Sequence, residues 1–244
     1  MEEEAIRQMQ AVETEHWWFV GRRSILSCVL HDLRLPHSAR ILEAGCGAGG
    51  NLEMLATLGE VSAFEPHPFC LDHARSRGIG DVRPGQLPYD IPFERASFDL
   101  VAALDVLEHL ADDHSGLVAL RNMLRPAGRI VVTVPAFMSL WSEHDVRHHH
   151  YRRYTKVELE QVASSAGFDE VRCSYFNTIL FPAIAGIRLI KNRLRHLSAN
   201  DDALPPWILN RMLAKIFASE RHLIKWVHFP AGTSLLLTGR QPYD

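Results

Sequence analysis

The feature that most constrains this chain is a glycine-rich stretch at residues 41–50, Ile-Leu-Glu-Ala-Gly-Cys-Gly-Ala-Gly-Gly. An apolar pair runs into an acidic residue, four glycines occupy six positions, and a helical pattern begins at Asn51. This is the pattern of a strand that ends in a tight turn and opens a helix. Glycine allows positive φ and lets a ligand lie against the backbone, and the following helix N-terminus favours an anionic group. The stretch therefore predicts a nucleotide-like cofactor over the end of the first strand.

Strand and helix patterns alternate after this stretch. Continuous apolar runs, such as that at residues 98–103, are typical of parallel strands buried on both faces. The alternation predicts a doubly wound α/β sheet whose last strand returns antiparallel. The strands expected are residues 39–44, 60–65, 81–83, 98–103, 129–134, 171–175 and 234–238. Helices are expected at residues 2–34, 51–58, 70–77 and 156–166, and from the strand at 98–103 up to about residue 124, before a turn at 125–128.

Two regions flank this alternation. Residues 136–154 are expected to form a loop dense in histidine, arginine and aromatic residues. Residues 176–230 are apolar-rich and mainly helical in pattern. We therefore expect a single domain over residues 1–244, divided into an N-terminal helical lid (1–35), a core (36–175), a helical cap insertion (176–230) and a last strand (231–244).

Composition excludes several function classes. The 244 residues are 47% hydrophobic and 23% charged, with a net charge of −3, which gives no electrostatic case for a nucleic-acid partner. Four scattered cysteines form no CxxC pair and are expected to be reduced. The acidic N-terminus is unlike a signal peptide, and no apolar run approaches the roughly 20 residues of a membrane-spanning helix. We expect a cytoplasmic protein.

The glycines alone leave the cofactor open. Gly45-x-Gly47-x-x-Gly50 also satisfies the dinucleotide fingerprint. Three features argue against a dinucleotide. Glu43 precedes the turn, where an anion would repel a pyrophosphate; the first expected strand begins only at residue 39; and Asp105 starts another acidic edge after the strand at 98–103. Acids beside the glycine turn favour a ligand that carries positive charge.

Several short motifs occur in the order and spacing of a known family. They are Glu43-x-Gly45-x-Gly47-x-Gly49, Glu65, Phe98-Asp99-Leu100-Val101, Leu107-Glu108-His109 and Leu124-Arg125-Pro126-x-Gly128 before a strand. Over about residues 15–175 the chain resembles class I S-adenosylmethionine-dependent methyltransferases. The resemblance implies a Rossmann-like, mostly parallel seven-stranded sheet with helices on both faces. His16-Trp17-Trp18-Phe19-x-x-Arg22-Arg23 and the region His144–Tyr154 resemble a bacterial small-molecule subgroup tied to glycan or secondary metabolism.

The resemblance also implies how S-adenosylmethionine is held, with S-adenosylhomocysteine as the product. The glycine turn would back the methionine part, Glu65 would accept the ribose hydroxyls, and Gln86 stands where many relatives carry an acid for the adenine amine. Asp105 would meet the ammonium and Arg22 the carboxylate. The residues expected at the cofactor are Arg22, Glu43, Gly45, Cys46, Gly47, Gly49, Glu65, Pro66, Gln86, Leu87, Asp105, Val106 and His109.

Methyl transfer to a hydroxyl needs a group that removes its proton, usually a histidine. By family position we favour His144 and His150 as catalytic residues, with Asp145 orienting an imidazole; the alternative is a solvated structural loop. Trp17, Trp18, Trp141 and Tyr154 are candidates for the acceptor pocket, with ordinary packing as the alternative. The family's metal-dependent members use acids and an amide that we do not find here, so no metal is expected.

The sequence therefore predicts a methyltransferase acting on a small molecule at a hydroxyl oxygen, in secondary-metabolite or glycan biosynthesis. N- or C-methylation, or an inactive cofactor-binding partner of a biosynthetic complex, are the alternatives. The apolar pattern within residues 176–230 suggests a cap first, a homodimer interface second and a membrane contact third. A cap of this kind favours an acceptor with an apolar or lipid-linked part.

Overall fold

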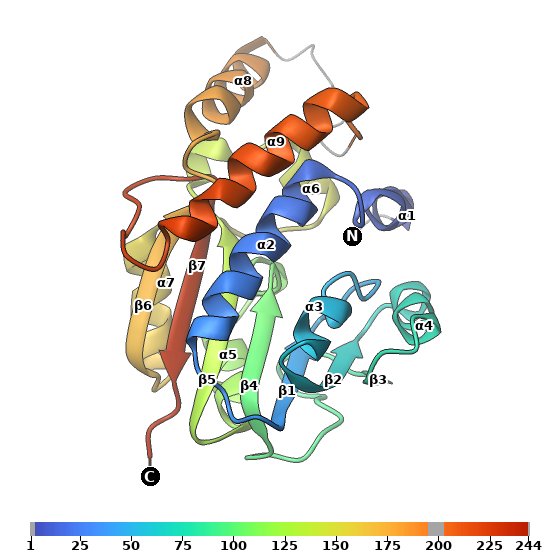
Figure 1. Cartoon of the computed structure of the whole chain (residues 1–244), viewed down its shortest axis with the longest axis vertical. Coiled ribbons are helices and arrows are strands. Elements are labelled where there is room, and N and C mark those ends of the chain that lie inside the picture. Colours follow the sequence, from blue (N-terminus) through green and yellow to red (C-terminus); the bar gives the residue numbers. More distant parts are fainter. Residues whose placement is uncertain (1–2, 195–202, 244) are drawn as a thin grey trace.

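The computed structural model describes residues 3–194 and 203–243 and contains one seven-stranded sheet in the order β3-β2-β1-β4-β5-β7-β6 (Figure 1). The pairings from β3 to β5 are parallel, and β7 runs antiparallel to both β5 and β6. The expected α/β sheet with an antiparallel last strand is thus confirmed. The strands are β1 (Ala39–Ala44), β2 (Gly59–Glu65), β3 (Asp81–Pro84), β4 (Phe98–Leu104), β5 (Leu124–Pro135), β6 (Asp169–Phe176) and β7 (Ser234–Arg240).

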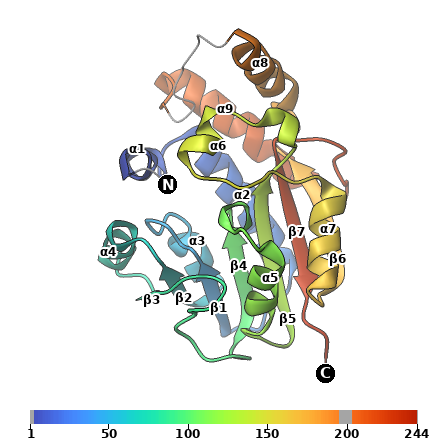
Figure 2. The same cartoon turned by 180° about the vertical axis from the view of Figure 1, so that it is seen from behind.

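Helices cover both faces of the sheet (Figures 1 and 2). Side chains of α2, α3, α4 and α9 pack with one face of the sheet, and those of α5 and α7 with the other. The α-helices are α1 (Glu3–Val12), α2 (Trp17–Asp32), α3 (Leu52–Ala56), α4 (Pro68–Ser76), α5 (Asp113–Arg121), α6 (Glu143–Arg147), α7 (Lys156–Ser165), α8 (Phe181–Leu194) and α9 (Trp207–Ser219). Short 3₁₀ helices are η1 (Leu107–His109), η2 (Met138–Leu140) and η3 (Glu220–His222).

Several expected boundaries are wrong. The helix expected over residues 2–34 is two helices, because the His16 side chain accepts a hydrogen bond from the Trp18 N–H and caps the start of α2. The helix expected up to residue 124 consists of η1 and the separate α5, and the expected loop at 136–154 contains η2 and α6. The turn expected at 125–128 lies inside β5, where Ala127 has φ +63°.

The N-terminal helix α2 lies against α9, which comes from the far end of the chain. A Cβ at Gly21 would lie 2.3 Å from Cδ1 of Phe217, so the two helices approach closely only because this position is glycine. The Trp17 N–H donates to Asn210 Oδ1 at 2.7 Å, and Asn210 Nδ2 donates to the Glu15 carbonyl. These contacts fix the start of α2 above the carboxyl ends of the strands.

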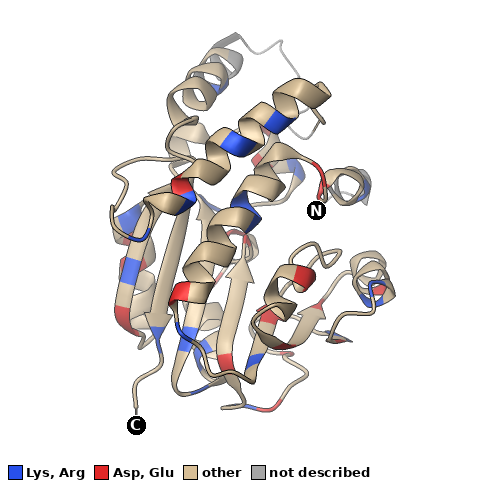
Figure 3. Cartoon of the chain, viewed as in Figure 1, with Lys and Arg blue, Asp and Glu red and all other residues tan. Residues whose placement is uncertain are grey.

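Charged residues of both signs are spread over the elements (Figure 3). The exposed face of α9 combines Arg211 and Lys215 with the apolar Trp207, Ile208 and Met212. Among the described residues, no helix is long and apolar enough to cross a membrane.

Candidate functional site

A cavity of about 790 Å³ lies at the carboxyl ends of the central strands. Ligands of open α/β sheets bind at this edge, outside the strand ends where the strand order reverses. The walls come from the N-terminal part of α2, the turn after β1, the end of β2, η1, the segment around α6, and α8.

The turn after β1 supplies a backbone cradle. Gly45 and Gly47 have φ of +62° and +54°, which side chains rarely tolerate. A Cβ added at Gly47 would meet no atom within 4 Å, so this position faces open space at the cavity. The Cys46 N–H donates to the Phe64 carbonyl at 3.1 Å and ties the turn to β2. The turn is therefore rigid and open to a ligand that lies against its backbone.

The carboxylate of Glu65 stands at the end of β2, beside the cradle. It accepts hydrogen bonds from the N–H groups of Gly47 and His67, both at 2.9 Å. Burial raises the pKa of Glu65, and these two bonds work against that rise. A carboxylate offers about four lone-pair sites, so the oxygens can still accept from hydroxyl groups of a ligand.

A chain of polar contacts joins α2 to the strand ends. Arg22 forms an ion pair with Asp105 and donates to Asn51 Oδ1 at 3.2 Å. Asn51 Nδ2 in turn donates to Glu43 Oε1 at 2.9 Å, and the Thr133 hydroxyl donates to Asp105 Oδ1. Both members of the ion pair line the cavity, so a positive and a negative group stand next to each other there.

Glu43 itself does not line the cavity, which corrects our expectation. It is 1% exposed, and burial raises its pKa to about 7. A group in this position cannot repel an approaching pyrophosphate as we argued from the sequence; instead it holds Asn51 in place. Gly49 is also absent from the lining; a Cβ added there would point at Leu52 and Arg77.

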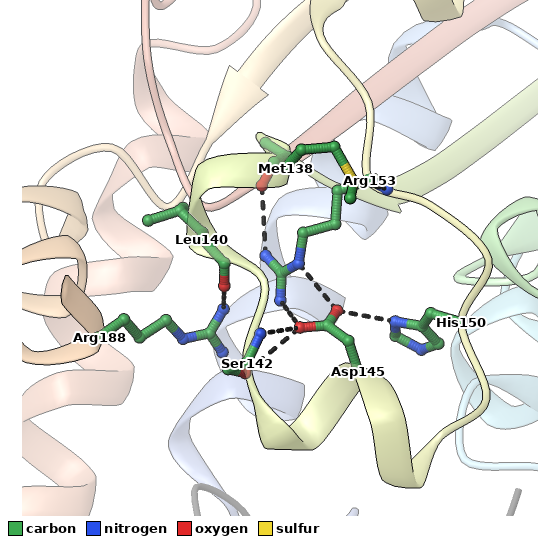
Figure 4. A network of polar contacts seen from close by, with 8 residues as sticks. Met138, Leu140, Ser142, Asp145, His150, Arg153 and Arg188 are labelled. Carbon is green, nitrogen blue, oxygen red and sulfur yellow. Dashed lines mark hydrogen bonds and ion pairs between the residues drawn. The ribbon is translucent and has the colours of Figure 1, made fainter. Parts of the chain in front are cut away.

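On the opposite wall, the buried Asp145 of α6 organises the polar groups (Figure 4). It accepts from Arg153 Nε at 2.8 Å and Nη2 at 2.9 Å, and from the Ser142 N–H at 2.8 Å. His150 Nδ1 lies 2.9 Å from its Oδ1. Burial alone would raise the pKa of Asp145, but the bonds from His150 and Arg153 outweigh burial and hold it below its ordinary value. Because the carboxylate can only accept, Nδ1 of His150 donates to it and Nε2 is the second ring nitrogen.

Glu108 and His109, both in η1, lie beside this histidine. The ring centroids of His109 and His150 are 4.6 Å apart in an edge-to-face arrangement. Burial, followed by the neighbouring imidazoles of His150 and His148, lowers the pKa of His109 to about 3, so its ring is neutral. Burial raises the pKa of Glu108, whose Oε2 has no hydrogen-bond partner among the described residues.

The structure brings most residues predicted from the sequence to one cavity. Trp141 and Tyr154 are not part of its lining; the Tyr154 hydroxyl donates to Asp113 Oδ2 at 2.8 Å, inside the core. The predicted residues that line the cavity are Trp17, Trp18, Arg22, Gly45, Cys46, Gly47, Glu65, Pro66, Gln86, Leu87, Asp105, Val106, His109, His144 and His150.

Sequence reasoning missed several polar residues of the lining, of which Asn51, Glu108, Arg153 and Arg188 bear on the chemistry of the site. Glu108 and Arg153 belong to motifs on which the family resemblance rests, and their place in those motifs could have identified them as site residues. Asn51 opens the helical pattern after the glycines. Arg188 of α8 has no such signal, because it reaches the cavity only through the packing of α8 near η2, where it donates to the Leu140 carbonyl at 3.4 Å.

Comparison with known proteins gives consistent relatives. A model of the family described as "Methyltransferase domain" matches residues 42–132. A probable S-adenosylmethionine-dependent methyltransferase of Mycolicibacterium smegmatis is 27% identical over 167 residues, 67% of this chain and 63% of that protein. The ubiquinone biosynthesis O-methyltransferase of Xanthomonas axonopodis pv. citri is 30% identical over 184 residues, 64% of this chain and 77% of that protein.

A solved structure shares the fold over nearly the whole chain. The S-adenosylmethionine-dependent methyltransferase of Thermotoga maritima superposes with a TM-score of 0.58 at 18% identity, over 96% of this chain and 99% of that one. The chain spans less than two thirds of the length of the mycobacterial relatives that it matches. With the sheet order, the cradle and these relatives together, the chain belongs to the class I S-adenosylmethionine-dependent methyltransferases, a family of enzymes whose methyl donor is S-adenosylmethionine.

Proposed function

We propose that this chain transfers the methyl group of S-adenosylmethionine to a hydroxyl oxygen of a small molecule, in secondary-metabolite or glycan biosynthesis. One observation carries the proposal: a single cavity is lined by the glycine turn and Glu65 on one side and by His144 and His150 on the other. We call these sides the donor wall (Gly45–Gly47 and Glu65) and the acceptor wall (Glu108, His109, His144, His150 and Arg153). His109, which we expected at the cofactor, is assigned to the acceptor wall because its ring lies against that of His150. The O-methyltransferase of Xanthomonas among the relatives supports oxygen as the acceptor atom.

The donor wall fits S-adenosylmethionine in its polar groups. Glu65 suits the two ribose hydroxyls, and the open space over Gly47 suits a ligand held against the backbone. The Asp105 and Arg22 pair offers an anion for the ammonium of the methionine part and a cation for its carboxylate. When bound, the cofactor supplies a methyl carbon activated by the adjacent sulfonium; the chain must align the acceptor and exclude water.

The acceptor wall fits proton removal. His150 is oriented through Nδ1 by an ionised carboxylate, so that Nε2 is the nitrogen left to contact an acceptor hydroxyl. His144 lines the same cavity from α6. Either imidazole can take the hydroxyl proton as the oxygen attacks. N- or C-methylation is the alternative in which neither histidine is required.

Helix α8 supports the prediction of a cap over the acceptor. The cavity is lined from α8 by two apolar side chains, Ile184 and Ile187, and by the cationic side chain of Arg188. An acceptor with an apolar or lipid-linked part and a polar reacting end matches this lining.

The donor side is tested by titrating S-adenosylmethionine in a calorimeter. Glu65→Gln is expected to weaken the affinity about 10- to 100-fold, because each hydrogen bond to a charged group contributes about 1.5–3 kcal/mol. Glu60→Gln is the matched control, since Glu60 lies on the same strand but is exposed at its other end. Failure of the wild-type protein to bind S-adenosylmethionine would overturn the proposal.

The acceptor side is tested by S-adenosylhomocysteine release with a panel of hydroxylated small molecules. His144→Ala or His150→Ala is expected to lower kcat about 10²- to 10⁴-fold, the usual contribution of general-base catalysis. If both variants keep their turnover, O-methylation assisted by a histidine base is wrong and N- or C-methylation gains. If the protein binds the cofactor but turns over no compound of the panel, it would instead be an inactive, cofactor-binding partner of a biosynthetic complex.

A further inference from the structure

One buried carboxylate of the acceptor wall has no ion-pair partner among the described residues. Asp105 pairs with Arg22 and Asp145 pairs with Arg153. Glu108 is 1% exposed, takes part in no ion pair within the described residues, and has no hydrogen-bond partner at Oε2. Burying an unpaired ionised carboxylate is costly, so a positively charged ligand at this oxygen would stabilise the ionised form.

Two imidazoles lie near this carboxylate. One ligand-capable atom from each of Glu108, His109 and His150 lies within 4.8 Å of the other two, and all three residues line the cavity. A Zn²⁺ ion with bonds of about 2.1 Å needs tetrahedral ligand atoms about 3.4 Å apart, so the ligands must approach by at most about 1.4 Å. Metal binding would therefore draw the three ligand atoms together by up to this amount.

The third residue is already oriented as metal-bound histidines are. Asp145 holds Nδ1 of His150 and is itself held by Arg153, which leaves Nε2 as the second nitrogen of the ring. A carboxylate behind a histidine in this way fixes the tautomer and the ring orientation at metal sites. The Glu108 carbonyl also accepts the Tyr151 N–H at 2.7 Å, which couples η1 to the segment that carries His150.

We propose that Glu108, His109 and His150 form a binding site for a divalent transition-metal ion of the Zn²⁺ class. Two imidazoles and one carboxylate suit Zn²⁺, Co²⁺, Mn²⁺ or Fe²⁺ better than Mg²⁺ or Ca²⁺, which prefer oxygen ligands. Three protein ligands leave at least one coordination position for a ligand in the cavity, as in catalytic zinc sites. Our sequence interpretation expected no metal, because the acids and the amide of the family's metal-dependent members are not found; the three ligands proposed here meet only in the folded chain.

The metal site deepens the proposed methyl transfer and rests on it for its chemical role. The acceptor hydroxyl would bind the ion, which lowers the pKa of a bound hydroxyl as it does that of water, and its proton would pass to His144 or to water. The oxygen then forms a bond with the methyl carbon, the carbon–sulfur bond breaks, and its electron pair stays on the sulfur of S-adenosylhomocysteine. His150 would act as a ligand in this scheme, and His144 would remain as the imidazole that takes the proton.

Metal binding is measured without the acceptor. The full chain, stripped with a chelator, is titrated with Co²⁺ while its visible absorption is followed, and Zn²⁺ is used as competitor. We expect one saturable site, with Zn²⁺ affinity weakened at least about 10-fold in Glu108→Gln and in His109→Ala, and about 10- to 100-fold in Asp145→Asn, which removes the group behind His150. His149→Asn is the matched control, because His149 is exposed in the same segment and asparagine tolerates its φ of +55°.

The outcomes distinguish a metal site at these three residues from adventitious binding and from a failure of the proposed methyl transfer. The proposal is overturned if no saturable site is found, or if the wild type and Glu108→Gln bind Zn²⁺ with equal affinity. It is also overturned if His149→Asn loses as much Zn²⁺ affinity as Glu108→Gln, because binding is then adventitious, to imidazoles of the loop. Titration of S-adenosylmethionine on the same samples reports whether each variant is folded at the donor wall. If the wild type binds S-adenosylmethionine but not Zn²⁺, only the metal site fails. If it binds Zn²⁺ at these residues but not S-adenosylmethionine, the proposed methyl transfer fails instead.

Discussion

The two walls of the cavity are built from different kinds of contact. The donor wall comes mainly from one strand–turn–helix segment, in which backbone geometry at Gly45 and Gly47 makes the cradle. The acceptor wall is assembled from η1, α6 and the residues after it, and depends on side-chain contacts centred on Asp145. A wall formed by local backbone geometry can be recognised from a short sequence motif. A wall formed by side chains far apart in the sequence can be recognised only in the folded chain.

The largest expected effect tests the donor wall through Gly47→Val. The variant places a β-branched side chain at positive φ and fills the cradle, so we expect S-adenosylmethionine affinity to fall at least about 1000-fold, or about 4 kcal/mol. Gly78→Val is the matched control: Gly78 has φ +66°, its added Cβ would also meet nothing within 4 Å, and it lies outside the cavity lining. Both variants should lose a similar amount of stability, about 1–2 kcal/mol, and an equal loss of binding in the control would contradict the cradle.

The second prediction tests the acceptor wall through Asp145→Asn. Removing one partner of a buried ion pair costs about 3–5 kcal/mol, because Arg153 keeps its charge without the carboxylate. Urea unfolding should show this loss, while S-adenosylmethionine affinity stays within about threefold, as expected for distant sites. Glu170→Gln, which breaks exposed ion pairs to Arg129 and Arg240, should cost less than about 1 kcal/mol. Loss of cofactor affinity in Asp145→Asn would show that the two walls are coupled.

The sequence predicted the donor wall better than the acceptor wall. The strand order, the glycine turn and the place of Glu65 followed from local patterns, since a strand end and the turn after it are adjacent in the chain. The direction of Glu43 did not follow, because a residue at a strand end faces the cavity or the interior according to partners such as Asn51. The break between α1 and α2 depends on one side-chain cap at His16, which hydrophobic periodicity does not report.

The acceptor wall was harder to predict for a physical reason. The Tyr154 hydroxyl binds Asp113, 41 positions earlier, and so lies in the core although its motif suggested a pocket residue. Glu108 and His150 also meet over a long separation in the chain. One sequence contains the residue types of such a cluster but not the packing that brings them together.

The third prediction concerns pH and the buried acid below the donor wall. The pKa of Glu43 is raised by burial from its ordinary 4.5 to about 7 in the folded chain. The stability linked to its proton is therefore full below about pH 4.5 and is lost as the pH rises through about 7. The loss is about 1.4 kcal/mol for each pH unit in that window and at most about 3.5 kcal/mol. Glu43→Gln should remove this decline in unfolding free energy measured from pH 5 to 8.

The control for this prediction is Glu53→Gln, which changes an exposed acid of the neighbouring α3. It should keep the wild-type pH dependence. A wild-type protein whose stability rises between pH 5 and 8 relative to Glu43→Gln would contradict the raised pKa. Because glutamine still accepts the bond from Asn51, a loss of cofactor affinity is not expected.

The smallest expected effect concerns the contact between α9 and α2, the helix that contains Arg22. Alanine in a helix interior is about 1 kcal/mol more favourable than glycine, so Gly186→Ala in α8, where an added Cβ meets nothing within 4 Å, should stabilise the chain. Gly21→Ala should do the opposite, because its Cβ would lie 2.3 Å from the Phe217 ring. Overpacking costs about 1–3 kcal/mol, which leaves a net loss of about 1 kcal/mol.

The sign of this effect can be reversed by removing the ring. In a Phe217→Ala background the methyl group at position 21 no longer meets Cδ1, so Gly21→Ala should become stabilising by up to about 1 kcal/mol in urea unfolding. If it stays destabilising there, the close approach of α2 and α9 does not depend on Phe217. If Gly21→Ala stabilises the wild-type chain, α2 can shift against α9 to accommodate the methyl group, and the placement of Arg22 then rests on its own contacts to Asp105 and Asn51.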